Sequence, residues 1–233
     1  IKPLTDLVRK HGALMLWDAS HAVGAIEMDF DKNGVDIAVG CTYKYGNSGP
    51  GSPAWLYVNK KVQAELQVPI QGWFSQGDQF AMGADFERAP GIRGFQIASP
   101  SLIGLRCIKS AFTMIEEAGI GAISEKAAIG TEMMIQLYDA WLAELGFTLL
   151  TSRNPQERGG HISIGHPEAA RICVALREFA DVIPDYRTPN SIRLAIAPLP
   201  TSYVEVWDGF ARIRDLVATR QYEKIKTTDS RVT

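Results

Sequence analysis

Two short apolar runs, each leading to a chemically reactive side chain, most constrain how this chain can fold. The run Leu14–Trp17 ends at Asp18, and the run from Val35 to Cys41 leads to Lys44. Apolar runs of this length, bounded by polar or glycine-rich segments, are typical of short buried strands. If the two strands are neighbours, Asp18 and Lys44 share one sheet edge, which is where open α/β sheets bind ligands.

Lys44 stands between two tyrosines and precedes a loop rich in Gly, Asn, Ser and Pro. Such a loop lets other groups approach the backbone closely. An amine that loses hydration at the rim of a sheet is suited to Schiff-base chemistry. Taken alone, however, Lys44 also suits a solvated side chain at the start of a loop.

Asp18 would supply the second half of this chemistry. A carboxylate that faces a lysine-bound pyridoxal phosphate (PLP) keeps the pyridine nitrogen protonated, so that the ring accepts electrons from a substrate carbanion. A helix cap or a simple salt bridge is the alternative role for this carboxylate.

Four motifs extend beyond Asp18 and Lys44 to other parts of the chain. They are Trp-Asp-x-Ser/Ala-His-Ala-Val-Gly at 17–24, Gly-Cys-Thr-Tyr-Lys-Tyr at 40–45, Gly-Trp-Phe at 72–74 and Ile-Arg at 192–193. Together they resemble the kynureninases, a family of PLP-dependent hydrolases of fold type I. The resemblance runs from about Gly12 to about Val217. The related class V aminotransferases and cysteine desulfurases usually have Gln where His21 stands, and they lack the tyrosine before the lysine.

The resemblance implies an α/β fold. Residues 1–118 would form part of the large PLP-binding domain with its connecting helix, residues 119–222 a small C-terminal α+β domain, and residues 223–233 a polar tail. Apolar runs predict strands at 13–18, 35–41, 54–58, 147–150, 161–164 and 191–197. The third follows the Gly/Pro loop closely and is expected to pair antiparallel with the second, and residues 69–98 are expected to form a long loop. Helices are expected at 4–10, at 60–66, from Ser99-Pro100, after a hinge at 119–121, from Pro167, and from Ser202. The helix after the hinge should end at Gly146, and Ser202 with Glu205 should form a capping box.

The resemblance also implies roles for residues in the first part of the chain. Lys44 holds PLP through a Schiff base and later moves the α-proton, while Asp18 pairs with the pyridinium nitrogen. His21 lies near the ring. Tyr43 contacts the phosphate and exchanges a proton at the reacting carbonyl.

Three further residues have implied roles, and each has an alternative. Trp73 and Ser99 would reach the cofactor phosphate across a dimer interface, but Trp73 could instead fill the core and Ser99 could cap a helix. Arg193 would hold the substrate α-carboxylate, although a core Asp or Glu is its alternative partner. Arg187 is a weaker candidate because it lies in a turn-like stretch.

The same resemblance implies a reaction in which water adds to the γ-carbonyl of kynurenine or 3-hydroxykynurenine. This reaction belongs to tryptophan catabolism, on the kynurenine pathway that leads to NAD. Cleavage of the Cβ–Cγ bond then gives anthranilate or 3-hydroxyanthranilate, together with alanine. Relatives often carry Gly-His where this chain has Ser75-Gln76, so the substrate preference is left open. A class V aminotransferase, a desulfurase-like enzyme and a non-catalytic fragment stay open as alternatives.

Composition narrows the choice of partners. The net charge of −2 suggests no nucleic acid or other polyanion, and no apolar window approaches the ~18 residues of a membrane span. Without a visible targeting peptide, a cytoplasmic homodimer is expected. The cysteines, Cys41, Cys107 and Cys173, are expected in the core, and no metal spacing accompanies them. The chain opens at Ile1 without Met, close to the Asp18 strand, which predicts a fragment that needs an upstream half.

Overall fold

The computed structural model describes residues 1–226, which divide into two compact units. Unit 1 contains residues 1–23 and 27–117, and unit 2 contains residues 24–26 and the chain from Ala118 onward. The assignment of cofactor-binding and small-domain roles to 1–118 and 119–222 stays a prediction. Most of the expected polar tail, residues 227–233, lies outside the described residues.

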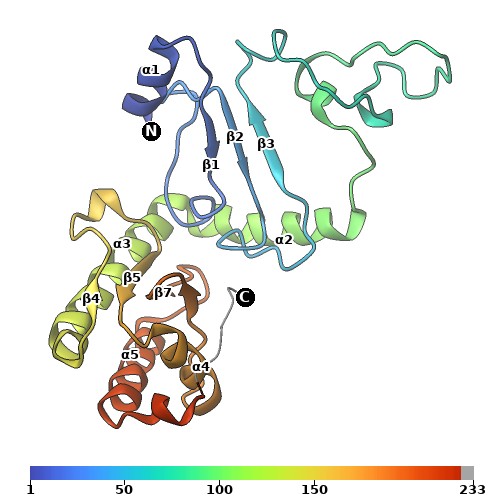
Figure 1. Cartoon of the computed structure of the whole chain (residues 1–233). Coiled ribbons are helices and arrows are strands. Elements are labelled where there is room, and N and C mark those ends of the chain that lie inside the picture. Colours follow the sequence, from blue (N-terminus) through green and yellow to red (C-terminus); the bar gives the residue numbers. More distant parts are fainter. Residues whose placement is uncertain (227–233) are drawn as a thin grey trace. The chain divides into compact units, whose positions relative to one another are not determined.

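Unit 1 is built on a three-stranded sheet in the order β1-β2-β3 (Figure 1). Its elements are α1 (Lys2–Lys10), β1 (Leu16–Asp18), β2 (Ile37–Gly40), β3 (Trp55–Val58) and α2 (Leu102–Ala118). Strands β1 and β2 are parallel, with Asp18 opposite Val39. Strand β3 returns antiparallel, with Trp55 opposite Gly40, so the expected antiparallel pairing of the third strand is confirmed.

The core of unit 1 is small. Its buried apolar residues are mainly alanines: Ala19, Val35, Ala38, Tyr45, Val58, Ala89 and Ala111. Leu14 and Leu16, by contrast, are 47% and 56% exposed at the β1 edge. Side chains of α2, β3 and the adjoining loops line an apolar cavity of about 420 Å³. The two faces of a sheet with parallel strands are normally both covered by other elements. The exposed leucines and the apolar cavity show that this sheet is covered less completely.

Two local predictions in unit 1 are wrong. Residues 60–65 form turns rather than a helix, with Val62 N donating to Asn59 O. Helix α2 begins at Leu102, and its N-terminal cap is Ser101, whose Oγ accepts from Gly104 N at 3.2 Å. The capping role expected of Ser99 therefore belongs to Ser101.

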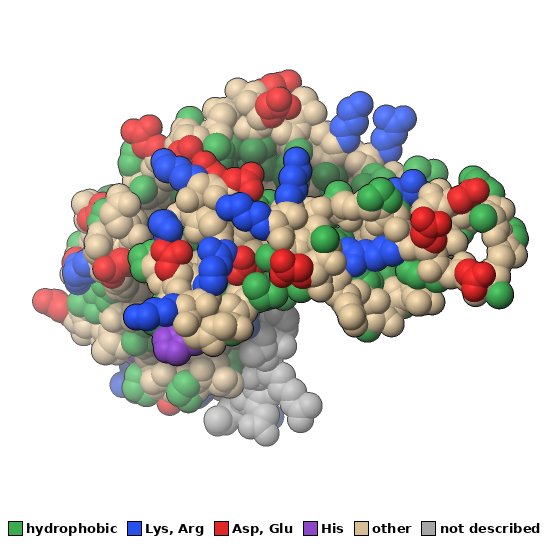
Figure 2. Space-filling view, turned by 90° about the horizontal axis from the view of Figure 1, so that it is seen from above, with side chains coloured by type: hydrophobic (Ala, Val, Ile, Leu, Met, Phe, Trp, Pro, Cys, Tyr) green, Lys and Arg blue, Asp and Glu red, His purple; other side chains and the backbone are tan. Residues whose placement is uncertain are grey.

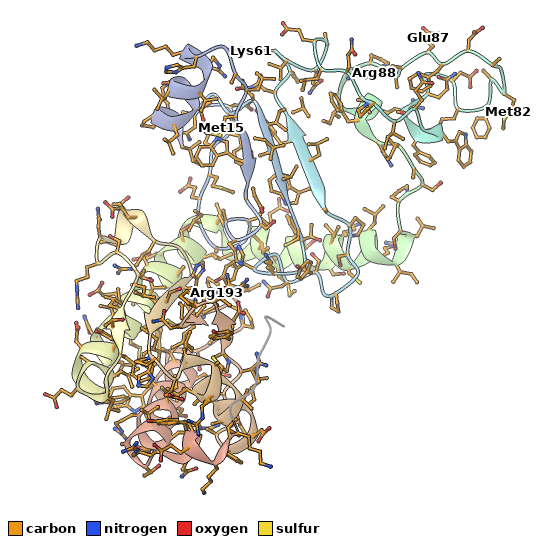
Figure 3. The ribbon with its side chains drawn as sticks, viewed as in Figure 1. Met15, Lys61, Met82, Glu87, Arg88 and Arg193 are labelled. Atoms are coloured by element: carbon orange, nitrogen blue, oxygen red, sulfur yellow. The ribbon has the colours of Figure 1, made fainter. Side chains whose placement is uncertain are left out.

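Residues 69–98 form the expected long loop. It carries two short 3₁₀ turns, η1 (Trp73–Ser75) and η2 (Gly91–Phe95), and one bridge between Gln76 and Arg88. Met82 lies at its far tip and is 84% exposed (Figure 3).

Unit 2 starts with a long helical segment. Helix α3 (Ile120–Leu137) continues into a π turn, η3 (Tyr138–Leu142), and a 3₁₀ turn, η4 (Ala143–Leu145). Gly146 ends the segment at φ 88°, a left-handed conformation that glycine adopts without strain. The predicted stop at Gly146 is confirmed.

An antiparallel sheet in the order β4-β5-β7-β6 follows. Its strands are β4 (Thr148–Leu149), β5 (His161–Gly165), β6 (Asp185–Arg187) and β7 (Ser191–Ala195), and the turn η5 (Pro155–Glu157) precedes β5. Helices α4 (Ala169–Phe179) and α5 (Tyr203–Ala218) and the turn η6 (Gln221–Lys224) complete unit 2. The predicted capping box of Ser202 and Glu205 at α5 is confirmed, whereas β6 was expected to be a turn.

Unit 2 has one continuous apolar core. Inward-facing residues of β5 and β7, such as Ile162 and Ile192, pack with Leu176 of α4 and Ile213 of α5. Ile225 is also buried in this cluster, and its carbonyl accepts from Arg171 Nε at 3.1 Å. The chain is thus still packed two residues after the point where a polar tail was expected to begin.

The surface is mixed in character. Basic and acidic side chains are interspersed over the face drawn in Figure 2. Within residues 1–226, no helix is long and apolar enough to cross a membrane, and no cluster of ligands suits a metal ion.

The three cysteines were expected in the core, but only Cys173 is buried. Cys41 is partly buried, and Cys107 is exposed on α2, so that prediction is wrong for Cys107.

Candidate active site

Asp18 and Lys44 belong to the same edge of the unit 1 sheet. Because β1 and β2 are parallel neighbours, Asp18 and the loop that follows Gly40 leave the sheet on one side. Hydrogen bonds from Ser20 lower the pKa of Asp18, and the positive charges of Lys44 and His21 lower it further. Asp18 is therefore an anion within electrostatic reach of the Lys44 amine.

The loop that carries Lys44 is held at both ends. The ladder pair Gly40–Trp55 closes it, and Thr42 Oγ1 donates to Pro53 O at 2.8 Å. Ser48 N donates to Thr42 O at 3.2 Å. A side chain at Gly46 would come within 2.5 Å of that same carbonyl oxygen, so this close approach needs glycine. The Lys44 backbone is thus fixed relative to β2.

Aromatic side chains on both sides of Lys44 in the sequence make contacts at this edge of the sheet. Lys44 Nζ lies 6.0 Å from the ring centroid of Tyr43, which is half exposed. His21 meets Tyr45 edge to face, with the ring centroids 6.4 Å apart. The structure therefore brings Asp18, His21, Tyr43 and Lys44 together within unit 1.

Trp73 lies in the 69–98 loop and is 51% exposed, so the alternative that it fills the core is wrong for this chain. Its Nε1 donates to Gln79 O at 2.7 Å, and its ring packs edge to face against Phe74 and Phe80. Ser99 is exposed and precedes the capped start of α2. Both side chains are accessible to a partner.

Arg193 lies on β7 in unit 2 (Figure 3). It forms an ion pair with Asp185, its direct neighbour on β6, and Arg187 donates to the same carboxylate oxygen at 2.7 Å. The alternative partner expected from the sequence, a core acidic residue, is therefore present. Two guanidinium groups therefore pair with the carboxylate of Asp185.

Sequence reasoning missed Asp185 and Ser20. Asp185 was hidden because β6 has only three residues and was expected to be a turn. The bond from Ser20 could have been predicted, because an aspartate side chain often accepts a hydrogen bond from the backbone N–H two residues further on.

Comparison with solved structures defines the class of fold. A cysteine desulfurase from Thermococcus onnurineus matches 94% of this chain and 56% of its own, with a TM-score of 0.72 and 18% identity. A mutant of the lyase C-DES, with glycine covalently linked to its PLP cofactor, matches 92% and 56%, with a TM-score of 0.75 and 19% identity. The fold is that of the C-terminal portion of fold-type-I PLP enzymes, so the predicted α/β class is confirmed.

Comparison of sequences finds similarity to one group of enzymes. Residues 123–213 match the kynureninase C-terminal domain. Kynureninase from Geobacillus thermodenitrificans is 40% identical over 226 residues, which are 96% of this chain and 52% of that protein. The chain is similar to the kynureninases over their C-terminal half, and it spans about half the length of the curated relatives it matches.

Proposed function

We propose that this chain carries part of the active site of a PLP-dependent hydrolase that cleaves the Cβ–Cγ bond of kynurenine or 3-hydroxykynurenine. The observation that carries the proposal is the anionic Asp18 beside the Lys44 amine, at the ends of two parallel strands. The 40% identity to a kynureninase supports this reaction type. Products would be alanine and anthranilate or its 3-hydroxy form, in tryptophan catabolism.

The donor set fits PLP. An ionised carboxylate suits a protonated pyridine nitrogen, and an amine on a fixed loop suits the cofactor aldehyde. His21 would lie near the ring, and Tyr43 would contact the phosphate. Trp73 and Ser99, both exposed, would reach the phosphate of a second subunit in a homodimer.

When bound, PLP supplies the electron sink for cleavage. Asp18 keeps the proton on the ring nitrogen. Lys44 takes the α-proton of the substrate, and Tyr43 exchanges a proton with the substrate γ-carbonyl oxygen as water adds there. Arg193 binds the substrate carboxylate, a role that suits a guanidinium group, which can donate two parallel hydrogen bonds to a carboxylate.

The test is covalent trapping of PLP. The chain is incubated with PLP, alone and with the N-terminal half of the Geobacillus relative, then reduced with borohydride and mapped by mass spectrometry. A pyridoxyl group on Lys44 is expected, and it should be absent from Lys44→Ala. The control is Lys61→Ala, at the opposite end of the sheet from Lys44, which should keep the adduct (Figure 3).

Turnover is then measured as anthranilate released from kynurenine. Trapping at a site other than Lys44, in both samples, would refute the assignment of the lysine. Trapping at Lys44 with transamination but no anthranilate would favour a class V aminotransferase. Trapping only in the presence of the second half would mean that this chain alone is non-catalytic.

A further inference from the structure

The long loop of unit 1 folds back on itself shortly after Trp73. Directly after η1, Gln76 forms a backbone bridge with Arg88, which lies on the returning part of the loop (Figure 3). Beside this bridge, Gly77 N donates to Glu87 O at 2.7 Å. The outgoing and returning parts of the loop are therefore paired at this point.

The side chain of Gln76 strengthens this pairing. Its Oε1 accepts from Glu87 N at 2.8 Å, and its Nε2 donates to Asp85 O at 3.4 Å. A side-chain amide can do both, because its oxygen is an acceptor and its nitrogen is a donor. Gln76 is thus bonded to the returning part of the loop through its side chain as well as its backbone.

The indole of Trp73 depends on where the chain leaves this pairing. Trp73 Nε1 donates to Gln79 O at 2.7 Å, and Gln79 lies three residues after Gln76. The bonds between Gln76 and the returning part of the loop fix the start of the path to Gln79. If these bonds are lost, the acceptor of the indole N–H gains freedom to move.

The start of η1 is fixed independently of Gln76. Ser75 is fully buried, and its Oγ accepts from Gly72 N at 3.1 Å and donates to Gly72 O at 2.8 Å. A side chain on Gly72 would collide with Ile97 O, so the backbone packs tightly here. The backbone of Trp73 is therefore held on this side, and the contacts of Gln76 hold the segment that follows.

We propose that Gln76 is a positioning residue: its side-chain amide fastens the returning part of the loop to η1, and so holds the Trp73 indole in place. The inference rests on the proposed function for its purpose, because Trp73 would there reach a cofactor phosphate. Its physical content concerns the loop of this chain alone.

The test uses the whole chain without cofactor. Exchange of the Glu87 amide and of the Trp73 indole N–H is followed by NMR, with the indole assigned through Trp73→Phe. Gln76→Met keeps the length of the side chain and removes both of its hydrogen bonds. It should speed both exchange rates by about fivefold, the effect of losing one net hydrogen bond. Gln76→Glu, which keeps an acceptor for Glu87 N, should stay close to the wild type in both rates.

Gln96→Met is the matched control, because Gln96 is exposed in the same loop and its side chain bonds to Ala98 O, two residues away. It should change neither rate. The proposal is overturned if Gln76→Met leaves the indole rate unchanged, since Gln76 would then only pair the two parts of the loop. It is also overturned if Gln76→Glu or Gln96→Met has the same effect as Gln76→Met. Since neither measurement involves PLP, failure to trap PLP on Lys44 would refute the proposed function and leave this result standing.

Discussion

Cys173 and Cys107 carry the same thiol in opposite surroundings. Cys173 is buried on α4, and this burial raises its pKa to about 12. Cys107 is exposed on α2. Since the thiolate is the reactive form, we predict that iodoacetamide at pH 8 labels Cys107 rapidly and Cys173 only when unit 2 unfolds. Peptide mapping over time checks this, and equal labelling rates in the folded chain would contradict it.

His166 gives a prediction for pH. It is 7% exposed, its ring lies 4.7 Å from that of Phe147, and its Nδ1 accepts from Glu168 N at 3.0 Å. Burial lowers its pKa, although a hydrogen bond with the Leu145 backbone partly offsets this. The unfolded chain therefore takes up this proton first, at about pH 6.5, and the folded state loses stability as the pH falls below that value.

His166→Gln removes this contribution, so its melting temperature should fall less steeply between about pH 7 and pH 5 than that of the wild type. The control is His11→Gln, because His11 is exposed at the end of α1. Calorimetry over this pH range gives both slopes. Equal slopes for His166→Gln and the wild type would exclude the predicted effect of burial.

At the scale of elements, Arg158 attaches the loop before β5 to α3. Its side chain is only 1% exposed, and it donates to Thr131 Oγ1, Glu132 Oε2 and Arg153 O. Arg158→Leu would remove this donor from the buried Thr131 hydroxyl and from the more exposed Glu132 and Arg153 carbonyl, and we predict a loss of about 2 kcal/mol in the free energy of unfolding.

Arg153→Leu is the matched control for this loss. Arg153 pairs with Asp139 on the surface, where ion pairs contribute little to stability. Urea unfolding followed by circular dichroism compares the two variants. A loss in Arg153→Leu as large as that in Arg158→Leu would show that Arg158 has no special structural role.

The elements also show where sequence patterns are sufficient. Strong periodicity and clear end signals predicted α5 and the stop at Gly146, because these signals are local. Strand β6 was missed because it exists through pairing with β7, which brings Asp185 opposite Arg193 from eight positions away. Either Ser99 or Ser101 could cap α2, because both stand beside Pro100 in the sequence. Which of them does so depends on where the backbone enters the helix, and the sequence does not specify that point.

For the candidate site, the sequence predicted which residues leave the sheet at one edge, because strand ends follow from apolar runs. It could not predict the partners of those residues. Ser20, Thr42 and Asp185 act through hydrogen bonds and ion pairs that form only when separate segments meet.

At the scale of the whole molecule, the two units differ in how much apolar surface they bury. The large core cluster lies entirely within residues 134–225, whereas the buried apolar residues of unit 1 are mainly alanines. Local stability follows such burial, so we predict slower amide exchange in β5 and β7 than in β1 and β2.

Hydrogen exchange with mass spectrometry tests this difference. If the proposed function is correct, the N-terminal half of the Geobacillus relative should slow exchange in β1 and leave β5 unchanged. Equal protection of both sheets in the chain alone would mean that the buried area of unit 1 underestimates its stability.

The Gly40–Trp55 ladder pair also limits how the loop between these residues can vary in length. The residues from Cys41 to Lys44 set the distance of the amine from β2, and one inserted residue there would move the amine by up to about 3.3 Å, the rise per residue of an extended chain. Insertions near Gly49 and Gly51, beyond the amine, would only enlarge the distal part of the loop. Natural length variation among related proteins should therefore concentrate after Asn47, and redesign of this loop should begin there.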